Sequence, residues 1–210
     1  EEAKAVGADL LLTHHPMIFK PLKRVSGEHF IGDKILTLAE SGMCYYAMHT
    51  NFDVMGMADA VAGQLGLEDR KGLTVTFEDG SIREGIGRAG ALPAPMTLAE
   101  CAEFVKSRCR IEQVKVFGMP AETVVMAAVC PGSGKSCIED AIRLGADVLI
   151  TGDIDHHEGI DSVEQGLAVI DAGHYGLEKI FVPYMEEYCS RKLAGVKVYA
   201  APEKEPFWMA

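Results

Sequence analysis

The stretch AIRLGADVLIT at residues 141–151 decides the fold class, because a helical pattern gives way within it to a strand. A near copy, AKAVGADLLLT, occupies residues 3–13. In both copies the helical part ends at a glycine, which adopts the left-handed conformation at a helix C-terminus at little cost. The unbroken apolar runs VLI and LLL that follow are typical of strands buried on both faces of a sheet. The two copies therefore predict equivalent helix–strand units.

A second pair of similar segments follows in the same order. Residues 42–47 read GMCYYA and residues 195–200 read GVKVYA, and each follows a helix-like stretch and predicts a strand. Each half of the chain then runs helix, strand, loop, helix, strand. The sequence thus predicts an α/β fold with two similar α/β lobes related by internal duplication, in which layered sheets carry flanking helices.

The predicted lobes have definite boundaries. We expect a first α/β lobe over residues 1–70, connecting strands and a helix over residues 71–130, and a second α/β lobe over residues 131–210, all in one compact body. The connecting region begins with a predicted hairpin that turns at Glu78-Asp79-Gly80-Ser81. Because the chain opens without Met, in what resembles the middle of a helix, we also expect the first lobe to lack an N-terminal segment.

Composition excludes several classes of protein. The 210 residues carry a formal net charge of −11, which repels phosphate backbones and argues against a nucleic-acid partner. No apolar run approaches the roughly 20 residues that a membrane helix needs, so we expect no membrane partner. None of the six cysteines forms a CxxC pair, which suits reduced thiols. With no signal peptide visible, these features predict a cytoplasmic globular protein.

Two adjacent histidines follow the first predicted strand. In Thr13-His14-His15-Pro16 the side chains can diverge toward two neighbouring ions where the strand turns into a loop, and Pro16 stiffens that exit. The alternative is a histidine pair that only caps the strand. The motif by itself does not decide between them.

A second motif follows the second predicted strand. The run HTNFD at residues 49–53 combines His49 and Asp53, nitrogen and oxygen donors that suit Zn, Mn or Fe rather than Ca. The alternative is an Asx turn in which Asn51 or Asp53 caps the next helix.

A third motif opens the last long helical region. In GHYGLE, at residues 173–178, His174 and Glu178 are four positions apart and share one face of a helix. That spacing can give one metal site two ligands, although an exposed His–Glu pair on a helix surface would look the same. The three motifs together offer too many donors for one tetrahedral zinc. They suit two ions that share a bridging carboxylate.

Two other runs invite a functional interpretation. The run PGSGKS at residues 131–136 lacks the first glycine of a P-loop, because Val129 stands at that position. It remains a candidate anion-binding turn before a helix for which Ser136 and Glu139 predict a capping box. In the other run, DIDHH at residues 153–157, Asp153 is a candidate to contact either a metal ligand or the substrate, and the alternative is a simple turn residue.

Taken together, the motifs THHP, HTNFD, GHYGLE, GSGKS and TGDIDHH resemble those of the Nif-three-like family of dinuclear metal centre proteins, which are also called GTP cyclohydrolase I type-two homologues. The resemblance covers essentially the whole chain. It implies two similar α/β lobes, a ring-shaped hexamer and two divalent metal ions per chain. It also implies that His49 lies close to the metals. The implied metal ligands are His14, His15, Asp53, His174 and Glu178.

These observations predict a function in outline. We expect a metal-dependent hydrolase of a small nucleotide-like substrate, with His49 and Asp153 as the catalytic candidates that carry a proton. The alternative is a non-catalytic metal-binding or regulatory scaffold. We also expect a homo-oligomer, most simply a hexamer, with the apolar tail at residues 206–210 in a subunit contact. A tail folded back on its own lobe is the alternative.

Overall fold

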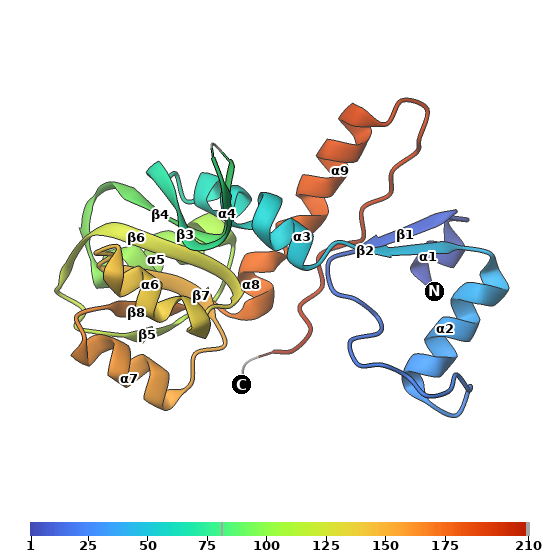
Figure 1. Cartoon of the computed structure of the whole chain (residues 1–210), viewed down its shortest axis with the longest axis horizontal. Helices are drawn as coiled ribbons and strands as arrows, with labels where there is room; N and C mark the ends of the chain where they lie inside the picture. The colour runs from blue at the N-terminus through green and yellow to red at the C-terminus, as the bar shows by residue number, and fades with distance from the viewer. Residues whose placement is uncertain (81, 209–210) are drawn as a thin grey trace. The chain divides into compact units, whose positions relative to one another are not determined.

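The computed structural model describes residues 1–80 and 82–208, which form two compact units (Figure 1). The first unit is Glu1–Phe52 and the second is Asp53–Ala210. The division falls earlier in the chain than the boundary at residue 70 that the sequence predicts. No helix of the described residues is both long and apolar enough to cross a bilayer.

The first unit is built around two short parallel strands. Its elements are α1 (Glu2–Ala5), β1 (Leu10–Thr13), α2 (Phe30–Ser41), β2 (Cys44–Ala47) and α3 (Thr50–Phe52). The strands pair in register from Leu10 opposite Cys44 to Thr13 opposite Ala47. Since parallel strands end at the same edge, the residues after β1 and after β2 emerge side by side.

The second unit is a six-stranded mixed sheet with helices on both faces. Its strands are β3 (Glu68–Asp79), β4 (Ile82–Thr97), β5 (Lys115–Phe117), β6 (Thr123–Ser133), β7 (Val148–Gly152) and β8 (Ala168–Asp171). Its helices are η1 (Asp53–Met57), α4 (Ala58–Gln64), α5 (Leu98–Cys109), η2 (Lys135–Cys137), α6 (Ile138–Arg143), α7 (His156–Glu164), α8 (His174–Glu178) and α9 (Phe181–Lys192). The strand order is β3-β4-β6-β7-β8-β5, and β6, β7 and β8 are parallel.

The alternation of side chains along the central strands explains why helices cover both faces of this sheet. Val148 and Ile150 of β7 belong to the core cluster that includes residues of α4, α5 and α8. Leu149, between them, belongs to the cluster that includes residues of α6. Every residue of β7 is buried, as the unbroken apolar run predicts.

The two similar stretches have the same order of elements but differ in burial. Every residue of β7 is buried, whereas Leu10 of β1 is exposed and the rest of β1 is only partly buried, so the prediction that β1 is buried on both faces is wrong. In each stretch, a short helix ends before a glycine of positive φ, Gly7 at 65° and Gly145 at 71°, and the chain continues into a strand, β1 or β7. Each strand has a parallel neighbour, β2 or β8. The sheets differ, however, since one has two strands and the other has six. Internal duplication therefore stays a prediction.

Several smaller expectations can be compared with the structure. Thr97 and Glu100 form a capping box that begins α5. The capping box predicted at Ser136 is wrong, because a 3-10 turn precedes α6 and Cys137 is its N-cap residue. The strand predicted at residues 195–200 is also wrong, since that segment is irregular. The predicted hairpin is formed by β3 and β4, and Ser81 in its turn lies outside the described residues.

Candidate metal-binding groups

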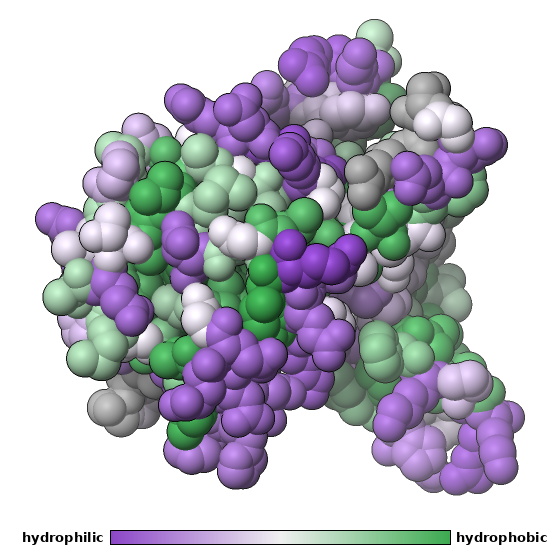
Figure 2. Space-filling view, turned by 60° about the vertical axis from the view of Figure 1, so that its left-hand side comes forward, coloured by the Kyte–Doolittle hydropathy of each residue, from purple (hydrophilic) through white to green (hydrophobic). Residues whose placement is uncertain are grey.

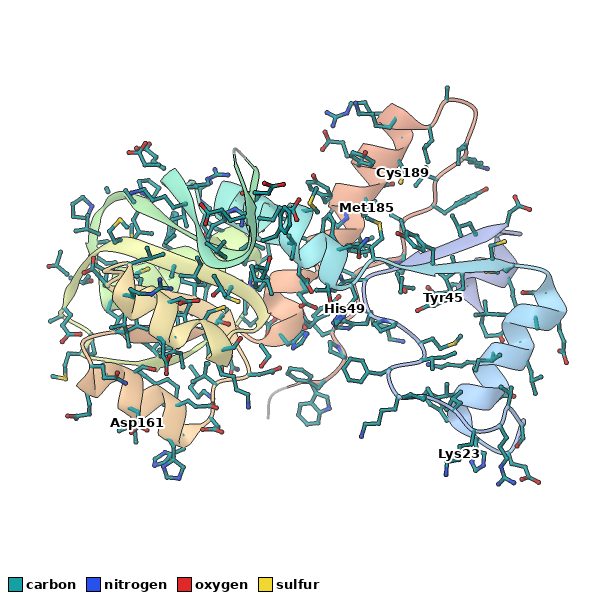
Figure 3. All side chains as sticks on the ribbon, in the orientation of Figure 1. Lys23, Tyr45, His49, Asp161, Met185 and Cys189 are labelled. Carbon is teal, nitrogen blue, oxygen red and sulfur yellow. The ribbon has the colours of Figure 1, made fainter. Side chains whose placement is uncertain are left out.

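Three histidines gather at the carboxyl ends of the two strands in the first unit. His14 and His15 follow β1, and His49, which is labelled in Figure 3, follows β2. Each offers one ring nitrogen, and these three nitrogens lie within 4.8 Å of one another. The parallel pairing of β1 with β2 is the cause, because it brings two loops that are distant in sequence to one edge.

The ring of His14 is held in a definite orientation. Its Nδ1 lies 2.8 Å from the carbonyl oxygen of Met48. A carbonyl oxygen only accepts hydrogen bonds, so Nδ1 carries the proton and Nε2 has the lone pair when the ring is neutral. A hydrogen bond of this kind from the second nitrogen is the usual support for a metal-bound histidine.

Tyr45 fixes the loop that carries the two adjacent histidines. Its hydroxyl oxygen accepts hydrogen bonds from the Met17 backbone N–H, at 2.7 Å, and from the Thr13 hydroxyl, at 2.9 Å. The same hydroxyl donates to the carbonyl oxygen of His15 at 3.0 Å. Sequence reasoning missed this residue, because a tyrosine inside a short strand gives no signal that its hydroxyl reaches the neighbouring loop.

The second unit holds another group of potential ligands, which follow the ends of the parallel strands β7 and β8. His174 and Glu178 lie on one face of α8, and His174 Nε2 is 3.2 Å from Glu178 Oε2. The helical pairing predicted from their spacing is therefore confirmed. The other ring nitrogen, Nδ1, is 2.7 Å from Oδ2 of Asp153, which follows β7 directly. Asp153 thus contacts a predicted ligand rather than only forming a turn.

The two carboxylates change the acidity of this histidine. The hydrogen bond with Glu178 has the largest effect and that with Asp153 a smaller one, and together they raise the pKa of His174 to about 9, although burial opposes them. Protonated imidazole cannot bind a metal, so any cation that binds here below pH 9 displaces a proton.

Two glycines let the backbone approach this group closely. A Cβ atom at Gly152 would lie 2.5 Å from the backbone nitrogen of His174, so only glycine allows α8 to begin beside the end of β7. At Gly132, whose φ is +76°, a Cβ atom would lie 2.4 Å from Oε1 of Glu178. The loop after β6 therefore packs directly against the Glu178 carboxylate.

Asp53 belongs to the second unit, although its motif begins in the first. It starts η1, a π-helical turn, and such turns are frequent at functional sites. The pKa of Cys130 in β6 is raised first by its hydrogen bond with Cys137 and then by burial, and the negative charges of Asp53 and Glu178 add to the effect. The unit boundary thus divides the HTNFD motif, leaving His49 on one side and Asp53 on the other.

The other suggestive runs have structural explanations. Asp155 and Glu158 form the capping box that begins α7, and His156 and His157 are exposed in its first turn. Lys135, the lysine of the P-loop-like run, is 3.6 Å from a carboxylate oxygen of Glu158. The structure thus brings His14, His15 and His49 together in one unit, and His174, Glu178 and Asp153 in the other. That the five predicted ligands belong to one centre stays a prediction.

Comparison with known proteins extends over nearly the whole chain. The family described as Duf34/NIF3 (NGG1p interacting factor 3) matches residues 1–206. A Clostridium perfringens protein named GTP cyclohydrolase 1 type 2 homolog is 33% identical, over 99% of this chain and 80% of its own length. A Lactococcus lactis protein with the same name is also 33% identical, over 99% of this chain and 79% of its own length.

Solved structures show the same fold. A Bacillus cereus protein related to NIF3 matches with a TM-score of 0.90 and 23% identity, covering 100% of this chain and 85% of its own. Reduced HcgD from Methanocaldococcus jannaschii matches with a TM-score of 0.73 and 31% identity, covering 91% of this chain and 74% of its own.

Proposed function

Because this chain belongs to the Duf34/NIF3 family, we propose that it binds two divalent metal ions and hydrolyses a small, nucleotide-like substrate. Relatives named GTP cyclohydrolase 1 type 2 homolog support a nucleotide as the substrate class. The proposed metal ligands are His14, His15, Asp53, His174 and Glu178. The observation that carries the proposal is the group of three histidines whose ring nitrogens lie within 4.8 Å.

The donor atoms suit Zn, Mn or Fe. Imidazole nitrogen and carboxylate oxygen together favour these borderline ions over Ca or Mg. Two of the histidines also have the outer support that metal-bound histidines need, from the Met48 carbonyl oxygen for His14 and from the Asp153 carboxylate for His174. This support is independent of any resemblance, because it comes from the hydrogen bonds of this chain.

Two residues near the proposed metal ligands, Asp153 and His49, have distinct roles in this proposal. When bound, a pair of divalent ions supplies Lewis-acid chemistry that polarises a substrate oxygen and acidifies water. Asp153 holds the ring of His174 in orientation through Nδ1. We assign proton transfer to or from the substrate to His49, which belongs to the three-histidine group but not to the proposed ligands.

The decisive experiment combines metal analysis with a substrate screen. The protein is loaded in turn with Zn, Mn and Fe and incubated with GTP, other nucleotides and simple phosphoesters. The proposal expects turnover that a chelator abolishes and that the His14→Ala variant loses. Metal-loaded protein that turns over none of these compounds would favour a non-catalytic metal-binding scaffold, and protein that binds no metal would contradict both.

Removal of one hydroxyl in the first unit should weaken the proposed centre. In Tyr45→Phe, the loop of His14 and His15 loses three hydrogen bonds at one oxygen. Each such bond contributes about 0.5–1.5 kcal/mol, so zinc affinity should fall by about 10-fold or more, as isothermal titration can measure. The matched control is Tyr46→Phe, on the adjacent position of β2. Equal affinities for the two variants would show that Tyr45 does not position the loop.

We also propose that the chain forms a homo-oligomer, with a hexamer as the expected assembly. Charged residues of the tail fold back on their own unit, since Glu203 pairs with Arg110 and Glu205 lies 3.5 Å from Lys179. Beyond them Phe207 is 62% exposed and Trp208 82% exposed. On the face drawn in Figure 2, apolar residues are exposed among polar ones. Met209 and Ala210 lie outside the described residues.

Sedimentation of the protein at micromolar concentration tests this assembly. Exposed aromatic groups of this size favour a contact surface, and burial of both would contribute a few kcal/mol per subunit, at about 25 cal/mol per Å². We expect the double variant Phe207→Ser, Trp208→Ser to dissociate at concentrations where the wild-type protein is assembled. A wild-type monomer of 22.7 kDa would contradict the proposed oligomer.

A further inference from the structure

Two cysteines of the second unit lie in contact at the base of one loop. Cys130 in β6 and Cys137 at the end of η2 are both buried, and their sulfur atoms are 3.1 Å apart. The residues between them are the PGSGKS run, in which Ser133, Lys135 and Ser136 are exposed. Sulfur atoms this close need to approach by only about 1 Å to reach the bond length of a disulfide.

The two thiols have different chemical character. The two sulfur atoms share one hydrogen bond in which either thiol can be the donor, and donation from the Cys130 thiol lowers the pKa of Cys137. The pKa of Cys130 is raised, first by that shared hydrogen bond and then by burial. Cys137 is therefore the nucleophile of the pair, because the thiolate is the reactive form. By contrast, burial raises the pKa of Cys101 to about 11.

The loop between the two cysteines also contacts a proposed metal ligand. Gly132 is two residues from Cys130, and a Cβ atom there would lie 2.4 Å from Oε1 of Glu178. The Cys130 carbonyl oxygen accepts a hydrogen bond of 2.7 Å from Thr151, in the strand that leads to Asp153. A disulfide would draw the two sulfur atoms about 1 Å closer than they are and would move this loop relative to the carboxylate.

We propose that Cys130 and Cys137 are a redox pair that peroxide converts into a disulfide, and that this disulfide lowers the affinity of the protein for metal by displacing the loop against Glu178. The second half of the inference rests on the proposed function, since it needs Glu178 to be a ligand. The first half does not. The pair thus constitutes a modification site separate from the histidines of the centre.

The reaction balances with hydrogen peroxide as the oxidant. The Cys137 thiolate attacks one peroxide oxygen, the O–O bond breaks, and a sulfenic acid forms while hydroxide leaves. The sulfur of Cys130 then attacks the sulfur of Cys137, the S–O bond breaks, and water leaves with the proton of the Cys130 thiol. Two thiols and one peroxide give one disulfide and two waters, so both electrons from the thiols reduce the peroxide.

Peptide mapping of the wild-type protein tests the disulfide directly. Trypsin cleaves after Lys135, between the two cysteines, so their peptides separate unless the disulfide links them. After treatment with stoichiometric hydrogen peroxide, we expect one linked mass that reduction splits. The variant Cys137→Ser should lose this mass, and the control Cys189→Ser should keep it. Absence of the linked mass from the wild-type protein would overturn the inference, whatever the variants do.

Zinc titration of the same samples tests the effect on the centre. Oxidised wild-type protein should bind zinc about 10-fold or more weakly than reduced protein, because loss of a group that supports a metal ligand typically has an effect of this size. Reduction should restore the affinity. Peroxide-treated Cys137→Ser should show no such change. A disulfide that forms without altering zinc affinity would overturn the proposed coupling. Reduced protein that binds no zinc would contradict the proposed function, while the linked mass still decides whether the pair is redox-active.

Discussion

The Glu178→Gln variant is expected to bind close to one divalent ion per chain under conditions in which the wild-type protein binds close to two. The substitution keeps the shape of the side chain, which packs against Gly132, but replaces a carboxylate by a neutral amide. An amide oxygen is a much weaker ligand for Zn or Mn, and it cannot bridge two cations with a compensating charge. Elemental analysis after exhaustive dialysis measures the stoichiometry.

A surface glutamate on the next helix provides the control. Glu186 is exposed on α9, and Glu186→Gln makes the same chemical change without altering the proposed centre. We expect this control to bind as many ions as the wild-type protein. If Glu178→Gln also retained both ions at unchanged affinity, Glu178 would be only the helix partner of His174 and the assignment of the centre would fail.

The Asp153→Asn variant is expected to lose about 10- to 100-fold in metal affinity, although Asp153 is not a proposed ligand. Its carboxylate oxygen is 2.7 Å from Nδ1 of His174 and holds the ring in place. An asparagine can keep one hydrogen bond there but not the negative charge, so the ring becomes a less basic ligand. Titration with zinc at pH 9.5 and at pH 7 measures the effect.

Measurement at two pH values separates two opposing effects of the Asp153→Asn substitution on zinc affinity. In the wild-type protein the pKa of His174 is about 9, so at pH 7 zinc must displace a proton, and apparent affinity rises with pH until about 9. Loss of the Asp153 charge lowers this pKa and reduces proton competition at pH 7. The affinity lost by the variant should therefore be larger at pH 9.5, where competition is absent, than at pH 7. An equal loss at both values would show that Asp153 acts only on ring orientation.

Sequence reasoning predicted the individual elements better than their arrangement. The apolar run at residues 148–150 became β7, which is wholly buried, because a strand with two helix-covered faces must be apolar on both. The segment at residues 195–200 carries a similar pattern but forms no strand. A strand exists only where a neighbour supplies hydrogen bonds, and in the second unit β7 has two parallel neighbours, β6 and β8.

The candidate site shows the same difference between what the sequence predicts, which is the chemistry of single residues, and what it does not, which is their contacts. The chemistry of His14, His49, His174 and Glu178 was readable from residue type and spacing, and the pairing of His174 with Glu178 follows from helical periodicity alone. The contacts that orient these side chains could not be predicted from the sequence. Tyr45 reaches the loop after β1 only because β1 and β2 are paired. Gly132 meets Glu178 only because β6 ends beside α8.

By itself, the sequence determined the α/β class, the buried strand β7 and the donor atoms available to a metal, since local periodicity and residue chemistry depend on near neighbours in the chain. The tertiary structure alone decided which loops meet at each strand edge, that Asp153 supports His174, and that Cys130 contacts Cys137. These contacts join residues distant along the chain, and strand order and register, which no local pattern encodes, set their distances.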